Sequence, residues 1–180
     1  YAEASGIPFE MNLIKNRYIH RTFIRPTAEL REHDLKMKLN PLVSAITGRR
    51  VVLVDDSIVR GTTMRKTVSM LREAGATEVH LLISSPPVLY PDFYGINTPK
   101  QSELIATGMT VPEIRTYVGA DTLHFLSFDG MIRSTGLPEA AFSASCFNGI
   151  YPTPIGHRAK EISHINLEDV LAHTPAPAAA

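Results

Sequence analysis

The sequence predicts an α/β domain in which short parallel strands alternate with helices. Residues 51–54 are four consecutive apolar residues, typical of a short strand covered on both faces of a sheet. Residues 78–84, with Val79, Leu81, Leu82 and Ile83, predict a second short strand. Between them, Met64, Val68 and Leu71 recur at helical spacing, so the three segments predict a βαβ unit with parallel strands.

Length and composition fit one globular domain with a hydrophobic core. The chain has 180 residues, of which 44% are hydrophobic and 20% charged. Lys plus Arg equal Asp plus Glu at 18 each, which argues against bulk attraction to nucleic acids or membranes. One cysteine, Cys146, excludes an intramolecular disulfide, and no signal peptide or long apolar span is visible, so we expect a cytoplasmic protein.

The segments before the first buried strand are short. Residues 1–6 resemble the end of a helix closed by Gly6, and because the first residue is Tyr1 we interpret the chain as a fragment. Residues 7–14 alternate loosely, as a strand would. Residues 40–50 predict a short helix, ended by Gly48, that leads into the strand.

A basic stretch covers residues 15–38. It contains seven Lys or Arg and three acids, and its apolar residues follow neither a helical nor a strand period. One interpretation is a mobile loop that orders when an anion binds. A solvated basic face is the simpler alternative. A nucleic-acid patch with Tyr18 and Phe23 interleaved is a third, weakly supported by one short run in a neutral chain.

The residues after the first strand predict a ligand site. Asp55 and Asp56 stand at the carboxyl end of the strand, where α/β sheets bind ligands, so one can meet a ligand while the other positions a cation or a basic group. Gly61 lets the backbone turn tightly, and we expect Thr62 or Thr63 to cap the next helix. The free N–H groups of this turn and helix start favour a phosphate. The simpler alternative is a turn that only caps the helix.

The remaining elements complete the predicted sheet. The Ser-Ser-Pro-Pro turn at 84–87 ends the second strand at the same sheet edge as the Asp pair and is a candidate wall of the pocket. Helices are predicted over 98–108 and 110–119, the second with a cap-like Thr and an acid in its first turn. Residues 123–126 are a last apolar strand.

Several motifs resemble one family. The run Asp-Asp-Ser-Ile-Val-Arg-Gly-Thr-Thr at 55–63 resembles the phosphoribosyl pyrophosphate (PRPP) loop of type I phosphoribosyltransferases. The sequence of this run is similar to that of glutamine PRPP amidotransferases in particular. It is not a Walker loop, because the chain has no Gly-x-x-x-x-Gly-Lys-Ser/Thr. Lys-Asn-Arg-Tyr at 15–18 resembles the start of the lid that closes over PRPP in that family. Cys-Phe-Asn-Gly at 146–149 is also similar, and the likeness spans roughly residues 1–160.

The resemblance implies a fold and a division of the chain. The expected fold is α/β, a type I phosphoribosyltransferase-like parallel sheet flanked by helices and truncated at its N-terminal edge, where the first strand would be missing. Residues 1–135 would form this domain, residues 136–165 an extension packed on it, and residues 166–180 a disordered tail.

The resemblance also implies an activity. Family members make 5-phosphoribosylamine from PRPP and glutamine-derived ammonia with release of pyrophosphate, the first step of de novo purine (IMP) synthesis. The ammonia comes from a glutaminase domain that this sequence lacks, Mg²⁺ neutralises the leaving group, purine nucleotides act as feedback inhibitors, and a homo-oligomer is expected. The implied PRPP-binding residues are Asp55, Asp56, Ser57, Ile58, Val59, Arg60, Gly61, Thr62 and Thr63, with Asp55 and Asp56 also on the Mg²⁺ side, and the implied catalytic lid residues are Lys15, Arg17, Tyr18 and Lys38.

Some members of the family hold an iron–sulfur cluster. At two of the cysteine positions of those members, this sequence has Asp92 and Ser143, which leaves Cys146 alone. Since a cluster needs about four thiolates, we expect none here and interpret Cys146 as a small buried hydrophobe.

Two other functions fit the same fold. The first is a non-catalytic regulator that senses PRPP or a nucleotide, but such proteins carry a DNA-binding module and none is visible. The second is a salvage phosphoribosyltransferase acting on a free base, which would share the Asp-Asp loop but not the lid or the Cys-Phe-Asn-Gly segment.

Overall fold

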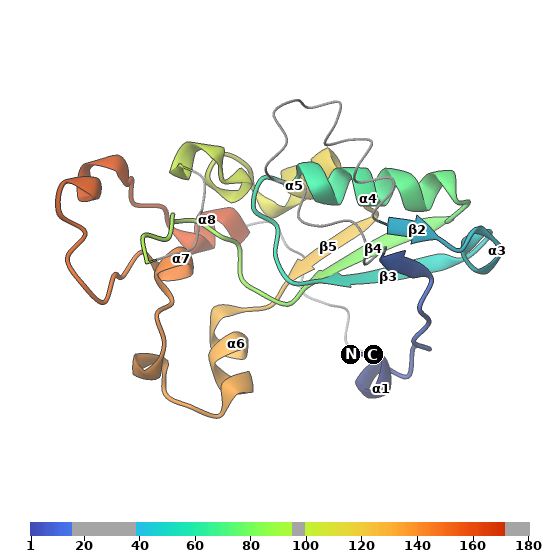
Figure 1. The fold of residues 1–180 in the computed structure, drawn as a ribbon, viewed down its shortest axis with the longest axis horizontal. Coiled ribbons are helices and arrows are strands. Elements are labelled where there is room, and N and C mark those ends of the chain that lie inside the picture. Colours follow the sequence, from blue (N-terminus) through green and yellow to red (C-terminus); the bar gives the residue numbers. More distant parts are fainter. Residues whose placement is uncertain (16–38, 95–99, 172–180) are drawn as a thin grey trace.

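The computed structural model describes residues 1–15, 39–94 and 100–171 (Figure 1). At its centre is a parallel sheet of strand order β3-β4-β5, formed by Arg50–Asp55, Glu78–Ile83 and Thr122–Phe125. Two short strands, β1 (Leu13–Lys15) and β2 (Leu39–Pro41), form a separate antiparallel pair. The predicted α/β class with a parallel sheet is confirmed.

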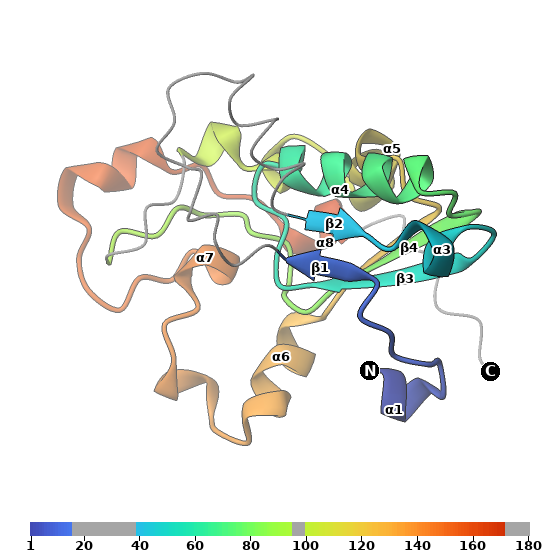
Figure 2. The same ribbon diagram turned by 45° about the vertical axis from the view of Figure 1, so that its right-hand side comes forward.

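Two helices accompany the sheet directly. Helix α4 (Thr62–Glu73) connects β3 to β4, and α5 (Val111–Val118) precedes β5; both lie on one side of the sheet, while α6 lies on the other (Figures 1 and 2). The other α-helices are α1 (Ala2–Ser5), α3 (Val43–Ile46), α6 (Phe128–Thr135), α7 (Ser145–Asn148) and α8 (Leu167–Leu171). Tight 3₁₀ turns occur at η2 (Gln101–Glu103), η3 (Ile105–Thr107), η4 (Glu139–Ala141) and η5 (Gly156–Glu161).

The hydrophobic core lies on one face of the sheet. Because side chains alternate along a strand, Val79 and Leu81 point to the same face, where they are fully buried in a cluster with residues of α4 and α5. Val54 points to the other face and is 51% exposed. The prediction that residues 51–54 are covered on both faces is therefore wrong in the described part of the chain, since the helices that pack against the core supply only one apolar layer.

Several local predictions are confirmed. Helix α1 ends at Gly6, which has a left-handed φ of 71°. Helix α5 begins with a capping box, in which the Thr110 backbone N–H donates to Glu113 at 2.7 Å, and it ends at Gly119. The strands predicted at 78–84 and 123–126 form within one residue of those bounds.

Two predicted elements are corrected by their long-range contacts. Of the strand expected at 7–14, only residues from 13 onward pair, because β2 offers three partners; Phe9 and Met11 remain 76% and 71% exposed. The helix expected at 98–108 is two 3₁₀ turns over its described part. The backbone N–H of Ile105 donates to Val59 at 2.8 Å and so leaves the helical pattern.

The C-terminal segment is more ordered than predicted. Residues 167–171, expected in a disordered tail, form α8, and Val170 in this helix is 6% exposed within the main core. Disorder was predicted because the surrounding residues are polar, but burial of the apolar side chains of this helix stabilises it. The rest of the predicted tail, 172–180, lies outside the described residues.

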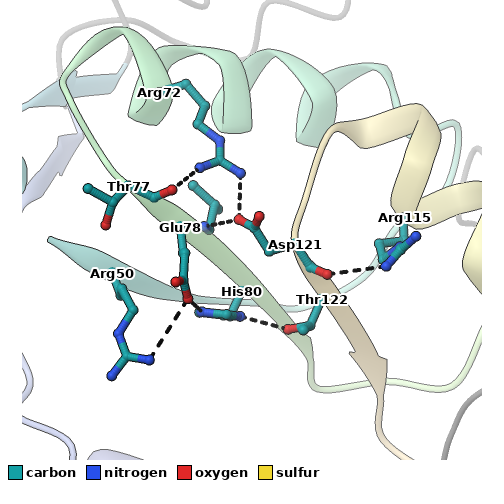
Figure 3. A network of polar contacts seen from close by, with 9 residues as sticks. Arg50, Arg72, Thr77, Glu78, His80, Arg115, Asp121 and Thr122 are labelled. Carbon is teal, nitrogen blue, oxygen red and sulfur yellow. Dashed lines mark hydrogen bonds and ion pairs between the residues drawn. The ribbon is translucent and has the colours of Figure 1, made fainter. Parts of the chain in front are cut away.

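Polar contacts tie the strands together where β4 and β5 begin (Figure 3). The Asp121 carboxylate accepts from the Val79 backbone N–H at 2.6 Å and from the Arg72 guanidinium, which also donates to the Thr77 carbonyl at 2.6 Å. On the neighbouring positions, His80 contacts Glu78 and Thr122 at 3.0 Å each. This network is at the opposite end of the strands from Asp55.

Asp121→Asn is expected to lower the free energy of unfolding by about 1 kcal/mol at pH 7, the low end for charged hydrogen bonds because the carboxylate is more than a third exposed. The Val79 N–H and then Arg72 hold the pKa of Asp121 below its ordinary value. Its stabilisation is therefore complete above the unfolded pKa of about 3.9 and is lost as the pH falls through the folded pKa. Urea unfolding at pH 6 and pH 3 measures this, with exposed Glu161→Gln as the charge control. A difference from wild type that does not shrink on acidification would contradict this account.

Candidate functional site

The site is built where β3 ends and α4 begins. Asp55 is the last residue of β3, and the main chain turns through residues 56–61 before α4 starts at Thr62. The Ser84 backbone N–H and hydroxyl both donate to the Asp55 carbonyl, at 2.9 and 3.1 Å. The Asp pair and the turn after β4 thus lie together at the carboxyl edge of the sheet, as the sequence predicted.

The two carboxylates are held by local bonds. Asp55 accepts from the Asp56 backbone N–H, and Asp56 accepts from the Ser57 hydroxyl, each at 3.0 Å. Both acids present surface to solvent. Partial burial nevertheless desolvates the Asp55 carboxyl, and this desolvation, with a smaller contribution from the Asp56 charge, raises its pKa. Two adjacent acids are therefore kept close, and neither of these two hydrogen bonds comes from a cationic side chain.

The loop leaves backbone donors for a ligand. Among the described residues, the backbone N–H groups of 57–61 donate no hydrogen bond. The first N–H groups of α4 add to them, because a helix start has no internal acceptors. With the positive end of the helix dipole, these donors suit a phosphate.

The predicted helix cap is corrected. The residue at the N-cap of α4 is Gly61, with φ 74°, and Thr62 and Thr63 are the first helical residues with exposed side chains. A glycine is needed here for two reasons. A Cβ at Gly61 would lie 2.5 Å from Ile105 Cδ1 and 3.1 Å from Tyr117 Cε1, and the left-handed backbone disfavours any other residue.

The side chains of two residues of the loop contact the body of the protein. Ile58 is 3% exposed and belongs to the core. Arg60 donates through Nε and Nη2 to Oε2 of Glu103, at 3.0 and 2.8 Å. The sequence placed both residues in the PRPP loop, and the structure shows that their side chains anchor it.

Three functional neighbours were missed by sequence reasoning, namely Glu103, Ile105 and Tyr117. They lie more than 40 residues after the loop, and no local spacing connects them to it. Arg65 of α4 lies over the Tyr117 ring, 5.3 Å from its centroid, so this aromatic side chain contacts both the loop glycine and the helix that follows.

Comparison with known proteins agrees with this geometry. Residues 3–85 match the phosphoribosyl transferase domain family. The chain is 52% identical over 172 residues to an amidophosphoribosyltransferase of Synechocystis sp., covering 96% of this chain and 34% of the relative. It is 55% identical over 159 residues to that of Bacillus subtilis, covering 86% of this chain and 33% of the relative.

A solved structure extends the likeness to three dimensions. The glutamine PRPP amidotransferase from B. subtilis, complexed with ADP and GMP, superposes with a TM-score of 0.75 at 55% identity, covering 87% of this chain and 35% of that chain. The chain is therefore similar to amidophosphoribosyltransferases over most of its own length. It spans about a third of the length of the curated relatives it matches.

The family's lid residues are only partly described. Lys15 is the last residue of β1, whereas Arg17, Tyr18 and Lys38 lie outside the described residues. The assignment of these four residues to a lid therefore stays a prediction.

Cys146 is the thiol in the region where the resemblance implies a cluster in some relatives. Cys146 is half-buried, not fully buried as predicted, and burial, with a smaller effect of Asp92, raises its pKa to about 11. Ser143 is exposed. No group of three or more His, Cys, Asp or Glu within residues 1–15, 39–94 and 100–171 is arranged to hold a metal.

A hollow of about 380 Å³ lies elsewhere, against the segment after α6. It is lined by Glu139, Ala140, Phe142, Ser143, Ala144, Asn148, Ile150 and Pro152. None of the predicted PRPP-binding residues lines it. We place the site at the β3–α4 turn, where the polar groups converge, and not in this hollow.

None of the helices in the described ranges has the length and apolar character that crossing a membrane requires.

Gly61→Ala is expected to lower the free energy of unfolding by about 1–3 kcal/mol, from the left-handed backbone and the contacts with Ile105 and Tyr117. Gly136→Ala is a matched control, since Gly136 has φ 70° and no atom within 4 Å of its would-be Cβ. Urea unfolding of both variants separates the free energy lost through the left-handed backbone from that lost through the contacts with Ile105 and Tyr117. Equal losses in the two would show that the Gly61 contact is not tight.

Proposed function

We propose that this protein carries the phosphoribosyltransferase site of an amidophosphoribosyltransferase. The observation that carries the proposal is the strand–loop–helix unit itself, in which an acid pair meets a run of backbone N–H groups that have no acceptor among the described residues, at the carboxyl edge of a parallel sheet. The high identity to amidophosphoribosyltransferases supports this enzyme over a non-catalytic regulator or a salvage enzyme.

In the proposed reaction, ammonia attacks C1 of PRPP, the C1–O bond to pyrophosphate breaks, and the leaving oxygen takes the bonding electrons. The attacking nitrogen loses a proton and 5-phosphoribosylamine results. Because the B. subtilis relative is a glutamine PRPP amidotransferase, we propose that the ammonia comes from glutamine through a glutaminase domain.

The chain's residues would divide this work. The N–H groups of residues 57–61 and of the start of α4 would bind the 5′-phosphate, with Thr62 and Thr63 exposed beside them. Asp55 and Asp56 would bind the ribose hydroxyls and the Mg²⁺ ion. Lys15, Arg17, Tyr18 and Lys38 would close over the pyrophosphate and exclude water.

The acid pair fits a Mg²⁺ ion. Mg²⁺ prefers oxygen ligands and is commonly held by one or two carboxylates together with substrate phosphates, so two adjacent exposed acids suffice on the protein side. When bound, Mg²⁺ would neutralise charge on the departing pyrophosphate.

Regulation is part of the proposal. The B. subtilis relative was solved with ADP and GMP, and we propose that purine nucleotides inhibit this protein too. A nucleoside 5′-monophosphate shares its 5′-phosphate with PRPP, so it would compete for the same loop. A homo-oligomeric assembly is a further expectation from the resemblance, and a cytoplasmic location is one from the composition of the sequence.

Pyrophosphate release from PRPP with Mg²⁺ tests the activity. The purified protein is expected to release pyrophosphate with a high concentration of ammonium salt. Glutamine in place of ammonium should give release only if a glutaminase domain is present. No release with ammonium, from protein that shows a cooperative melt, would refute the enzymatic proposal and favour a PRPP or nucleotide sensor.

Asp55→Asn and Asp56→Asn are each expected to slow this release about a hundredfold, because each removes a preorganised charge from the site. Asp55→Asn should do so without lowering the melting temperature. Since the folded pKa of Asp55 is raised, its ionised form opposes folding at neutral pH, and a neutral amide does not.

The control for this pair is Glu73→Gln, an exposed acid at the far end of α4, which should keep normal release. Normal release by either aspartate variant would contradict the roles assigned to the pair.

A further inference from the structure

The segment 101–105 contacts the loop at residues 56–61, which we call the phosphate loop after its proposed ligand, in three independent ways. The Ile105 backbone N–H donates to the Val59 carbonyl at 2.8 Å. The Ile105 side chain packs so tightly on Gly61 that a Cβ there would lie 2.5 Å away. Between these two contacts, Glu103 accepts two hydrogen bonds from Arg60. Three successive loop residues are thus each fixed by this segment.

The segment is itself anchored. Gln101 is 7% exposed, and its amide Nε2 donates to the carbonyls of Leu89 and Ser163, at 3.0 and 2.9 Å. Its Oε1 accepts from the Ser163 backbone N–H at 2.7 Å. Since a buried amide satisfied on both ends permits little movement, Glu103 stands on a rigid support only two residues away.

The Arg60–Glu103 pair is not explained by stability. Both side chains are about half exposed, and exposed ion pairs contribute little to the free energy of folding. Its position is more informative, because Arg60 immediately precedes the N-cap of α4. An arginine free at this point could swing over the loop and bind a phosphate by itself, in variable positions. Held by Glu103, it instead leaves phosphate binding to the backbone donors.

We propose that Glu103 is a positioning residue of the phosphate loop, which by holding the Arg60 guanidinium keeps residues 59–61 in the conformation that binds the 5′-phosphate of PRPP. This inference rests on the proposed function for its ligand. Its physical basis is preorganisation, since a loop that is already ordered loses less conformational entropy when the phosphate binds.

The test uses Glu103→Gln, Arg60→Gln and the double variant in the purified protein. Arg50→Gln is the control, because Arg50 faces Glu78 in an exposed pair at the opposite end of β3. Two quantities are measured, namely hydrogen exchange of the Ile105 amide without ligand, and KM and kcat for PRPP with ammonium. The first follows the loop contact itself and does not depend on activity.

Glu103→Gln is expected to speed exchange at Ile105 and to raise the KM for PRPP about three- to fivefold, the range of one exposed ion pair, with kcat within twofold of wild type. Arg60→Gln should do the same, and the double variant should be no worse than either single one, because both residues act through one contact. Arg50→Gln should change neither quantity.

Other outcomes would overturn the inference. Unchanged exchange would show that Glu103 does not hold the loop, and faster exchange with an unchanged KM would make its role merely structural. Additive losses in the double variant would show that Glu103 acts without Arg60. If wild-type protein did not use PRPP, the proposed function would fail separately, and an unchanged affinity for inorganic phosphate in Glu103→Gln would then overturn the positioning role.

Discussion

The packing of α4 and α5 on one face of the sheet is the contact on which the rest of the structure depends. Val79, Leu81 and Leu123 bring that face of the sheet into the core, and Val68 and Ile114 bring the two helices to it. This packing fixes where α4 starts relative to the end of β3. The loop at 56–61 has to bridge that fixed gap in six residues, and it does so with a left-handed glycine at the last of them.

The candidate site combines groups that folding alone would not favour. Asp55 is desolvated beside a second acid, and the backbone N–H groups of residues 57–61 donate no hydrogen bond within the described part of the chain, so neither feature stabilises the fold. The surrounding structure compensates, because Ile58 is buried in the core and Arg60 is held by Glu103. Such an arrangement is typical of a site that is ordered before its ligand arrives, and it suits a proposed reaction whose main requirement is to hold charged groups in place.

The polar network at the other end of the strands has a different character. Arg72 and Asp121 each combine side-chain and backbone contacts, and they join the end of α4 to the starts of β4 and β5 (Figure 3). Every charged group in it faces a partner. The two ends of the sheet therefore separate stability from the proposed chemistry, as the general pattern of α/β proteins leads one to expect.

The sequence by itself determined the βαβ unit, the position of the acid pair and the helix ends with local signals. Apolar runs, the capping box at Thr110 and the glycine at position 6 act through neighbours a few residues away, so their effect can be recognised without a structure. The family could be recognised too, because its loop is one continuous segment.

Only the tertiary structure decided which contacts hold that loop. Glu103, Ile105 and Tyr117 reach it from distant segments, and the same contacts divide the expected helix at 98–108 into two turns. Tertiary packing likewise left Val54 exposed and drew Val170 into the core, against the local pattern in each case. The reason is physical: hydrogen bonds and burial with partners far along the chain outweigh local propensities of a fraction of a kcal/mol per residue, as is generally found.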